Sequence, residues 1–279
     1  GTVIYRPVWL YTGTQEAIAV NGVKIQTISI QKEERSARVE IKVETYQEGE
    51  AEVEITDDRG EVVAALKINC GEPKENERYG GSSIVEIKNA KFWSTETPVL
   101  YSCKVRFGED EVTETFGIRK IEWNENVGFE MNGERVSLRG ACIHHDNGVL
   151  GACSYPEAEE RRVRILKENG YNAIRCAHNP CSKALLDACD KLGMLVMDEY
   201  VDMWYIHKNK YDYANHMRKW WKQDLKDMVE KDYNHPSVIM YSTGNEVAET
   251  GEKEGIELTG QMTEYLHAID GTRPETCGI

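Results

Sequence analysis

The spacing of apolar residues changes part-way along this chain of 279 residues, and this change constrains the fold more than any other feature. From about residue 18 to 118, apolar and polar residues alternate, as where Val39, Ile41 and Val43 alternate with charged residues. A period of two is typical of half-buried antiparallel strands. After about residue 136, short apolar segments alternate with amphipathic stretches, which predicts parallel strands joined by helical crossovers. The chain is long enough to form a core in each half.

The first half contains about seven short apolar segments separated by turn residues. In one pair, Val53 and Ile55 are followed by a turn at 57–60 and a returning strand at 62–68. Another strand is predicted at 99–107. Many short strands within about a hundred residues are typical of an immunoglobulin-like β-sandwich. We therefore assign residues 18–120 to such a domain.

The second half, residues 121–279, has the pattern of an α/β domain. The predicted strands are 136–143, 173–176, 195–197, 238–242 and 275–279, and the predicted helices are 156–169, 255–269, one around Cys189 and one around Leu225. An open doubly wound sheet and a closed (β/α)8 barrel both have this alternation of strands and helices. The order of elements alone therefore leaves both architectures open.

Polar groups follow four of these strands, and they favour the barrel. The groups are His144-His145-Asp146, His178-Asn179-Pro180, Asp198-Glu199 and Asn245-Glu246. In a barrel, the loops after the strands form one active site. A doubly wound nucleotide-binding domain would have a glycine-rich turn after its first strand, and residues 150–152 do not provide one. We therefore predict the first half of a TIM barrel, strands one to about five, since a whole barrel takes about 250 residues.

Glu246 is the strongest catalytic candidate. It follows an apolar strand and Gly244, where the backbone can turn, so its carboxyl is expected in the mouth of a pocket. Asn245 beside it offers a donor and an acceptor for a sugar hydroxyl. Trp204 lies just beyond a predicted strand, where an aromatic ring either stacks on a sugar or belongs to the core. Adjacent residues of a strand point apart, so His144-His145 is not expected to bind one metal ion.

Composition excludes several kinds of partner. The net charge of -14 argues against a nucleic-acid partner, because nucleic-acid binders concentrate positive charge. No apolar run approaches about 18 residues, so no membrane span is expected. The eight cysteines form no CxxC pair, which favours reduced thiols and a cytoplasmic location, although Cys70 and Cys103 are candidates for an inter-sheet disulfide. The chain begins Gly1-Thr2-Val3 without Met, so any signal peptide would lie upstream.

Several motifs, in order along nearly the whole chain, resemble those of glycoside hydrolase family 2, the β-galactosidase, β-glucuronidase and β-mannosidase group. The motifs are Gly1 to Leu10, Phe92-Trp93-Ser94, Pro98 to Tyr101, Phe116-Gly117-Ile118-Arg119, Asn132-Gly133, Leu138-Arg139-Gly140, Asn172 to Arg175, His178-Asn179-Pro180, Met197-Asp198-Glu199, Asn234 to Val238 and Gly244-Asn245-Glu246. The first resembles the closing strand of that family's N-terminal sugar-binding jelly roll. The resemblance therefore assigns residues 1–17 to the tail of that domain.

The resemblance implies a retaining hydrolase of terminal β-linked sugars. Glu246 matches the general acid/base, and the nucleophile, a second carboxylate about 5 to 5.5 Å away, would lie on a later strand outside this chain. Asp146 and His178 match positions that hold sugar hydroxyls, and Asn245 matches the contact to the 2-hydroxyl. The further substrate-binding candidates are Asn179, Glu199 and Trp204. We expect a small-molecule carbohydrate as the ligand, no cofactor, and no set of residues that commits to a metal.

The stretch Val201-Asp202-Met203-Trp204 is most similar to the bacterial β-galactosidase branch. A β-glucuronidase or β-mannosidase, and a non-catalytic carbohydrate-binding module, are the alternatives. With the nucleophile missing, the segment alone is expected to be inactive. The unpaired edge strands of a half barrel predict a homodimer or a partly disordered sheet.

Overall fold

The chain forms two compact units in this computed structural model, which describes residues 6–14 and 16–278. One unit contains residues 8–135 and 234–236, and the other contains residues 6–7, 136–233 and the chain from 237 onward. Of the segment assigned to a jelly roll, residues 1–5 and 15 lie outside the described residues. The described residues 6–14 form no strand, and the strands with which a jelly roll would pair them are not among the described residues.

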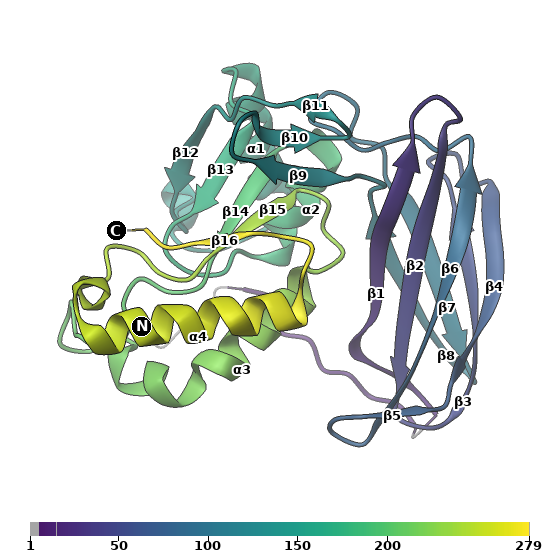
Figure 1. Ribbon diagram of the computed structural model, residues 1–279, viewed down its shortest axis with the longest axis horizontal. Coiled ribbons are helices and arrows are strands. Elements are labelled where there is room, and N and C mark those ends of the chain that lie inside the picture. The colour runs from purple at the N-terminus through teal and green to yellow at the C-terminus, as the bar shows by residue number, and fades with distance from the viewer. Residues whose placement is uncertain (1–5, 15, 279) are drawn as a thin grey trace. The chain divides into compact units, whose positions relative to one another are not determined.

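The first unit is a β-sandwich of two four-stranded antiparallel sheets (Figure 1). One sheet has the order β1-β2-β6-β5 and the other has the order β4-β3-β7-β8. The strands are β1 (Ile18–Gln31), β2 (Ser36–Thr45), β3 (Gly49–Thr56), β4 (Val62–Cys70), β5 (Glu72–Lys74), β6 (Arg78–Lys88), β7 (Tyr101–Phe107) and β8 (Asp110–Phe116). The immunoglobulin-like sandwich predicted from the alternating pattern is confirmed.

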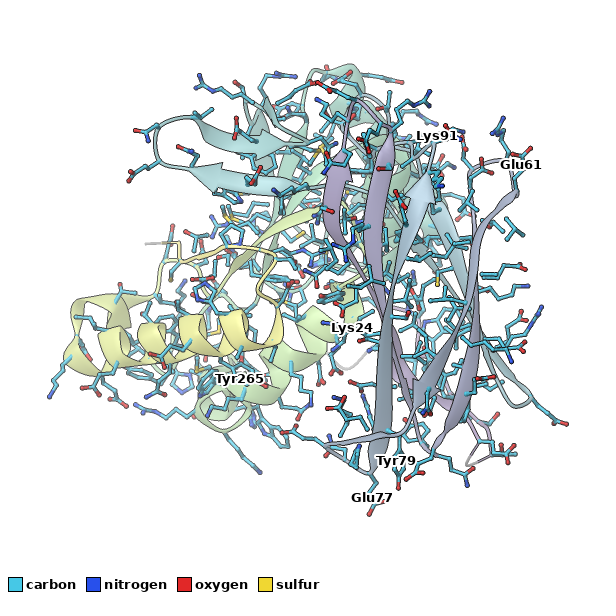
Figure 2. All side chains as sticks on the ribbon, turned by 45° about the vertical axis from the view of Figure 1, so that its right-hand side comes forward. Lys24, Glu61, Glu77, Tyr79, Lys91 and Tyr265 are labelled. Carbon is cyan, nitrogen blue, oxygen red and sulfur yellow. The ribbon has the colours of Figure 1, made fainter. Side chains whose placement is uncertain are left out.

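The alternation in sequence becomes an alternation in burial. On β2, Val39, Ile41 and Val43 are buried against the other sheet, while charged residues occupy the positions between them. Burial of these side chains is the main favourable term in the stability of the sandwich. Glu61 and Glu77 lie in exposed turns at the ends of strands (Figure 2).

The disulfide considered for Cys70 and Cys103 does not form, because both thiols are free and buried. Cys70 lies on β4 and Cys103 on β7, and these strands belong to the same sheet with β3 between them. Strands two apart are separated by about 9–10 Å, which exceeds the Cα–Cα distance that a disulfide allows. Burial raises the pKa of the Cys103 thiol to about 12.

A small antiparallel sheet of order β11-β10-β9 ends this unit. Its strands are β9 (Ile121–Asn124), β10 (Gly128–Met131) and β11 (Glu134–Arg135). Asn132, in the turn after β10, donates through Nδ2 to the carbonyl of Trp93 at 3.0 Å and accepts through Oδ1 from the backbone N–H of Lys120 at 2.9 Å. These bonds fix the small sheet to the loop that carries the buried Trp93.

The second unit is a parallel sheet of five strands with helical crossovers (Figure 1). Its elements are β12 (Gly140–Ile143), η1 (Gly148–Leu150), α1 (Pro156–Glu168), β13 (Ala173–Cys176), α2 (Lys183–Leu192), β14 (Leu195–Glu199), α3 (Ala214–Asp232), β15 (Val238–Ser242), η2 (Ala248–Gly251), α4 (Lys253–Ile269) and β16 (Glu275–Thr276). The strands lie in chain order without a reversal. A doubly wound sheet reverses its order, so this order settles the alternative in favour of the start of a TIM barrel.

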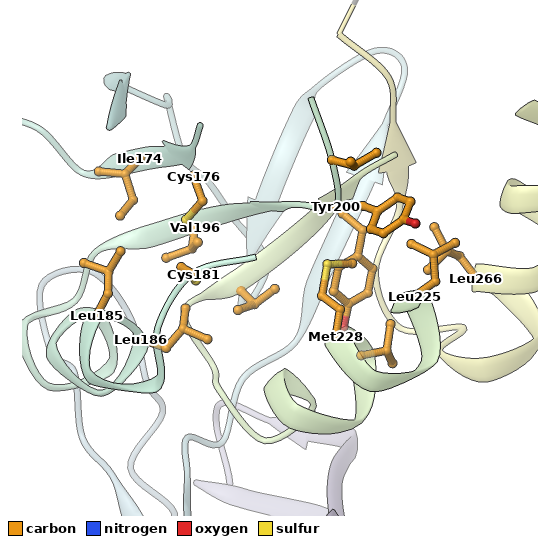
Figure 3. Close-up of a cluster of buried hydrophobic side chains, with 14 of the residues drawn as sticks. Ile174, Cys176, Cys181, Leu185, Leu186, Val196, Tyr200, Leu225, Met228 and Leu266 are labelled. Atoms are coloured by element: carbon orange, nitrogen blue, oxygen red, sulfur yellow. The ribbon is translucent and has the colours of Figure 1, made fainter. Parts of the chain in front are cut away.

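Local signals place the helices of this unit. Helix α1 begins at Pro156, whose ring suits the first helical position, and α2 ends before Gly193, which adopts a left-handed φ of 74°. The Ser182 hydroxyl accepts a hydrogen bond from the backbone N–H of Leu185 at 3.2 Å and caps α2. Figure 3 shows Leu185 and Val196 within the hydrophobic cluster between helices and sheet.

Several predicted strand limits differ from the structure: β7 begins at Tyr101 rather than at residue 99, and β16 ends at Thr276, before the predicted limit. The first strand begins at Gly140 rather than at residue 136, because the Asn172 side chain bonds the backbone of the preceding segment: its Oδ1 accepts from the N–H of Arg139, and its Nδ2 donates to the carbonyl of Ser137. Strand β14 continues to Glu199, so Asp198 and Glu199 end the strand instead of following it. Among residues 6–14 and 16–278, no helix is both long and apolar enough to span a bilayer.

Candidate active site

The side chain of Glu199, the last residue of β14, is the centre of a polar network at the carboxyl end of the parallel sheet. Glu199 is completely buried, with 0% exposure. Arg175 Nε donates to its Oε2 at 2.7 Å, Ser242 Oγ donates to the same oxygen at 2.7 Å, and His178 Nδ1 donates to Oε1 at 2.6 Å. A buried carboxylate is tolerated when it is paired and hydrogen-bonded in this way.

These partners come from the two strands that flank β14. Arg175 lies on β13, His178 follows β13, and Ser242 ends β15. Because parallel strands bring their carboxyl ends to one edge, residues far apart in sequence meet at one carboxylate. Burial lowers the pKa of Arg175, but the hydrogen bond and charge of Glu199 outweigh it and raise the pKa overall.

Asn245 extends this network toward Glu246. Its Oδ1 accepts from Arg175 Nη2 at 2.8 Å, and its Nδ2 donates to Asp202 Oδ1 at 2.9 Å. Asp202 also accepts from Lys208 Nζ at 2.8 Å. Partial burial raises the pKa of Asp202, but hydrogen bonds from Lys208 and Asn245 outweigh it and leave the pKa below its ordinary value. The Asn245 side chain is thus fixed by both of its polar atoms.

Glu246 directly follows this fixed residue. It adopts a left-handed φ of 45°, and its side chain is exposed and has no hydrogen-bond partner among the described residues. Its carboxyl was expected in the mouth of a pocket, but within residues 6–14 and 16–278 it is exposed and lines no described pocket. Five strands do not close a barrel of eight, so the wall that would face Glu246 is not supplied by these residues.

Trp204 is buried beneath the turn at 243–246 and hydrogen-bonds to it. This corrects its interpretation as a sugar-stacking residue. It has 0% exposure, so neither ring face is open to a ligand. Its indole Nε1 donates to the carbonyl of Thr243 at 3.0 Å. A Cβ added to Gly244 would lie 2.8 Å from this nitrogen, which explains why a glycine occupies the position. Trp204 therefore positions the backbone that leads to Glu246.

The group after β12, His144-His145-Asp146, lies farther from the network around Glu199. The Asp146 side chain is 80% exposed, and its carboxylate lies 3.9 Å from Arg162 Nη2. His144 packs its ring edge-on against His178, with centroids 5.3 Å apart. Through that contact, the β12 group reaches the network, whereas the Asp146 carboxylate makes no hydrogen bond to it among the described residues.

His145 and Asn179 are held by Arg6, at the start of the described chain. Arg6 Nη2 lies 2.7 Å from His145 Nε2 and donates to Asn179 Oδ1 at 3.1 Å. Arg6 Nη1 donates to the carbonyl of Pro180 at 2.9 Å. Burial and the charge of Arg6 lower the pKa of His145 to about 4, so its imidazole is neutral and can accept from the guanidinium.

A cavity of about 570 Å³ lies beside the network. His178, Asn179 and Asp202 line one part of it, and Tyr200 and Met228 belong to its largely apolar remainder. Its size is within the range of small-molecule pockets. Glu246 is not among its lining residues.

Within the described part of the α/β unit, three side chains bring metal-ligand atoms within 4.8 Å of one another: Cys176, Cys181 and Asp198. Asp198 Oδ1 already accepts from the N–H and the Sγ of Cys181, and burial raises the pKa of the Cys181 thiol well above its ordinary value. We assign no ion to this group.

The sequence-based candidates therefore divide into those in one network and those outside it. His178, Glu199 and Asn245 are hydrogen-bonded into the network, with Glu246 next in the chain, while Asp146, Asn179 and Trp204 are not members of it. Four members of the network are not among the site residues predicted from the sequence: Arg175, Asp202, Lys208 and Ser242. Arg175 had a local signal, because it is a charged residue inside a four-residue apolar strand. Lys208 had none, since it lies in an irregular loop.

Comparison with known proteins identifies both units. Residues 18–119 match the model described as glycosyl hydrolases family 2, and residues 124–278 match that family's TIM barrel domain. The chain is 34% identical to β-galactosidase BoGH2A of Bacteroides ovatus, over 100% of this chain and 37% of the relative. It is 29% identical to a β-glucuronidase of Bacteroides fragilis, over 82% of this chain and 34% of the relative. The crystal structure of a glycosyl hydrolase family 2 member from Bacteroides cellulosilyticus superposes with a TM-score of 0.87 at 36% identity, covering 94% of this chain and 35% of that one.

Proposed function

The chain belongs to glycosyl hydrolase family 2, and from this membership and the geometry of the strand ends we propose that the protein containing it hydrolyses terminal β-glycosidic bonds of a carbohydrate with retention of configuration. One observation carries the proposal. Asn245 is fixed through both polar atoms at the carboxyl end of β15, and the next residue, Glu246, has an unengaged carboxyl group among the described residues. The chain spans 37% of the length of the β-galactosidase it matches, so the activity is proposed for the longer protein.

In this proposal Glu246 protonates the glycosidic oxygen as the leaving group departs, and its carboxylate then deprotonates the water that attacks the glycosyl-enzyme intermediate. His178 and Asn245 hold sugar hydroxyls at the network, with Asp146 and Asn179 at its margin. Glu199 is completely buried and takes three hydrogen bonds, which suits it to orient Arg175 and His178.

Retention needs a second carboxylate as nucleophile. Neither acidic member of the network is free for this role: Glu199 is buried and paired, and Asp202 is bonded to Lys208 and Asn245. We therefore propose that the nucleophile lies outside residues 1–279 and that this segment alone has no turnover.

The substrate is proposed as a β-galactoside, since the most extensive match above is to a protein named a β-galactosidase. The match to a β-glucuronidase makes β-glucuronides the alternative. The two proposals differ in the sugar whose glycosidic bond is cleaved, galactose or glucuronic acid.

The test is a panel of 4-nitrophenyl β-glycosides, with galactose, glucuronic acid and mannose as the sugar, assayed with the full-length protein that contains this chain. Turnover of one of them, with the β-anomer formed first in proton NMR, is the expected result. First formation of the α-anomer would contradict retention. Binding of a sugar in calorimetry without turnover of any substrate would favour a non-catalytic carbohydrate-binding module.

A further inference from the structure

In the turn that carries Glu246, each backbone carbonyl from residue 243 to 245 accepts a hydrogen bond from another part of the unit. The carbonyl of Thr243 accepts from Trp204 Nε1 at 3.0 Å, that of Gly244 accepts from the N–H of Gly278 at 2.8 Å, and that of Asn245 accepts from Lys208 Nζ at 2.7 Å. The carbonyl of Asn245 belongs to the peptide that joins Asn245 to Glu246. Its donor therefore controls the peptide nearest to the proposed acid/base.

That peptide needs such support because Glu246 has a left-handed φ of 45°. Residues with a Cβ rarely adopt this conformation, and they persist in it only where the surroundings hold them there. Lys208 makes the hydrogen bond nearest to Glu246 in this turn, since its ammonium donates to the carbonyl of the preceding residue.

Lys208 is itself fixed in place. Its Nζ also donates to Asp202 Oδ1 at 2.8 Å, and the same oxygen accepts from Asn245 Nδ2 at 2.9 Å. Its backbone N–H donates to Asp212 Oδ2 at 2.7 Å. The lysine therefore joins the loop between β14 and α3 to the backbone and, through Asp202, to the side chain of Asn245.

We propose that Lys208 is a positioning residue that sets the direction of the Glu246 carboxyl by holding the Asn245–Glu246 peptide. It acts through Asn245 and need not touch the substrate. The inference rests on the proposed function, because it assigns Lys208 to the acid/base of that reaction. Without the ammonium, the carbonyl of Asn245 loses its donor and the Asp202 carboxylate loses its cation, so the turn is free to leave its strained conformation.

The consequence is specific to proton donation. A leaving group of high pKa needs a proton as it departs, whereas 2,4-dinitrophenolate departs without one. A displaced Glu246 should therefore slow hydrolysis of a phenyl glycoside more than that of a 2,4-dinitrophenyl glycoside. A general loss of packing would slow both substrates alike.

The experiment compares Lys208→Met in the full-length protein with Lys210→Met, which removes the same charge two positions along the same loop. The Lys210 ammonium lies 5.1 Å from the centroid of the Tyr211 ring and makes no bond to the turn. For Lys208→Met we expect kcat/KM to fall at least about tenfold more with the phenyl than with the dinitrophenyl glycoside, and for Lys210→Met we expect no change with either. An equal fall with both substrates, or none, would overturn the proposal.

A second variant and a second measurement keep the test decisive. Lys208→Arg keeps the charge, but a planar guanidinium directs its donors differently, so the same dependence on the leaving group is expected at smaller size. A crystal structure of residues 1–279 with Lys208→Met should show Glu246 outside the left-handed region. This structural result does not depend on turnover: if the wild-type protein cleaves no glycoside, a Glu246 turn unchanged by Lys208→Met rejects the positioning role, and an altered turn supports it while the proposed function fails.

Discussion

Arg175→Met tests how much the free energy of unfolding falls when the buried carboxylate of Glu199 loses its cationic partner. In the wild type Arg175 Nε and Nη2 lie 2.7 and 2.5 Å from Glu199 Oε2, and Glu199 has 0% exposure. Removing one partner of a buried ion pair typically costs about 3–5 kcal/mol, because the other charge stays buried without compensation. Arg175 is 25% exposed and Ser242 still donates to Glu199, so we expect the lower end, about 3 kcal/mol.

The assay is urea-induced unfolding of residues 1–279, with amide hydrogen exchange in β13 and β14 to report on the α/β unit. Arg164→Met is the matched control, since it removes an exposed pair with Glu168 at 4.0 Å, for which about 0–1 kcal/mol is expected. The double variant Arg175→Met/Glu199→Leu should recover most of the loss, because it removes the stranded charge as well. A cost for Arg175→Met no larger than that for Arg164→Met, or a double variant as unstable as Arg175→Met alone, would refute the dependence of buried Glu199 on its cation.

Three further predictions concern pH and packing. Burial raises the pKa of Asp198 well above its ordinary value of 3.8, so the stability that this group contributes at low pH is lost as pH rises from that value through the folded pKa. Asp198→Asn should therefore flatten the fall of Tm with rising pH above 3.8, and an unchanged slope would count against it. His145, with a pKa of about 4 when folded against about 6.5 when unfolded, contributes stability that is lost as pH falls between these values, and its imidazole signals should titrate in NMR near 4 rather than near 6.5. Gly244→Ala should cost about 1–3 kcal/mol in urea unfolding, because its Cβ would lie 2.8 Å from Trp204 Nε1, whereas Gly251→Ala, with no atom within 4 Å of the new Cβ, should cost less than about 0.5 kcal/mol.

Much of the fold was predictable because hydrophobic period depends on local sequence. Strand β13 and strand β15 have the predicted limits, Ala173–Cys176 and Val238–Ser242, since each is an apolar run bounded by polar residues. The sequence predicts that the third barrel strand ends at Met197, because two acidic residues follow. Glu199 nevertheless lies inside β14, since Arg175 and His178 compensate its charge, and that compensation exists only once the neighbouring strands have paired.

Only those parts of the site that follow from the order of the parallel strands were predictable from the sequence. Parallel strands bring residues at their carboxyl ends together, which correctly joined His178, Glu199 and Asn245. The burial of Trp204 and the reach of Lys208 depend instead on the path of the loop after β14, which has no period to reveal it. The domain limits at residues 17 and 120 stay predictions, as do the catalytic and substrate-binding roles.

The most direct test of the account compares Glu246→Gln with Glu264→Gln, an exposed glutamate on α4, in the full-length protein. General acid catalysis typically contributes about 10²–10⁴-fold, so Glu246→Gln should lower kcat/KM for a phenyl β-glycoside by about that factor. The same variant should still form the glycosyl-enzyme from a 2,4-dinitrophenyl glycoside, with a burst of dinitrophenolate, because only the later hydrolysis then lacks its base. Glu264→Gln should resemble the wild type with both substrates. Wild-type turnover of the phenyl glycoside by Glu246→Gln would contradict the assignment of Glu246 as the acid/base.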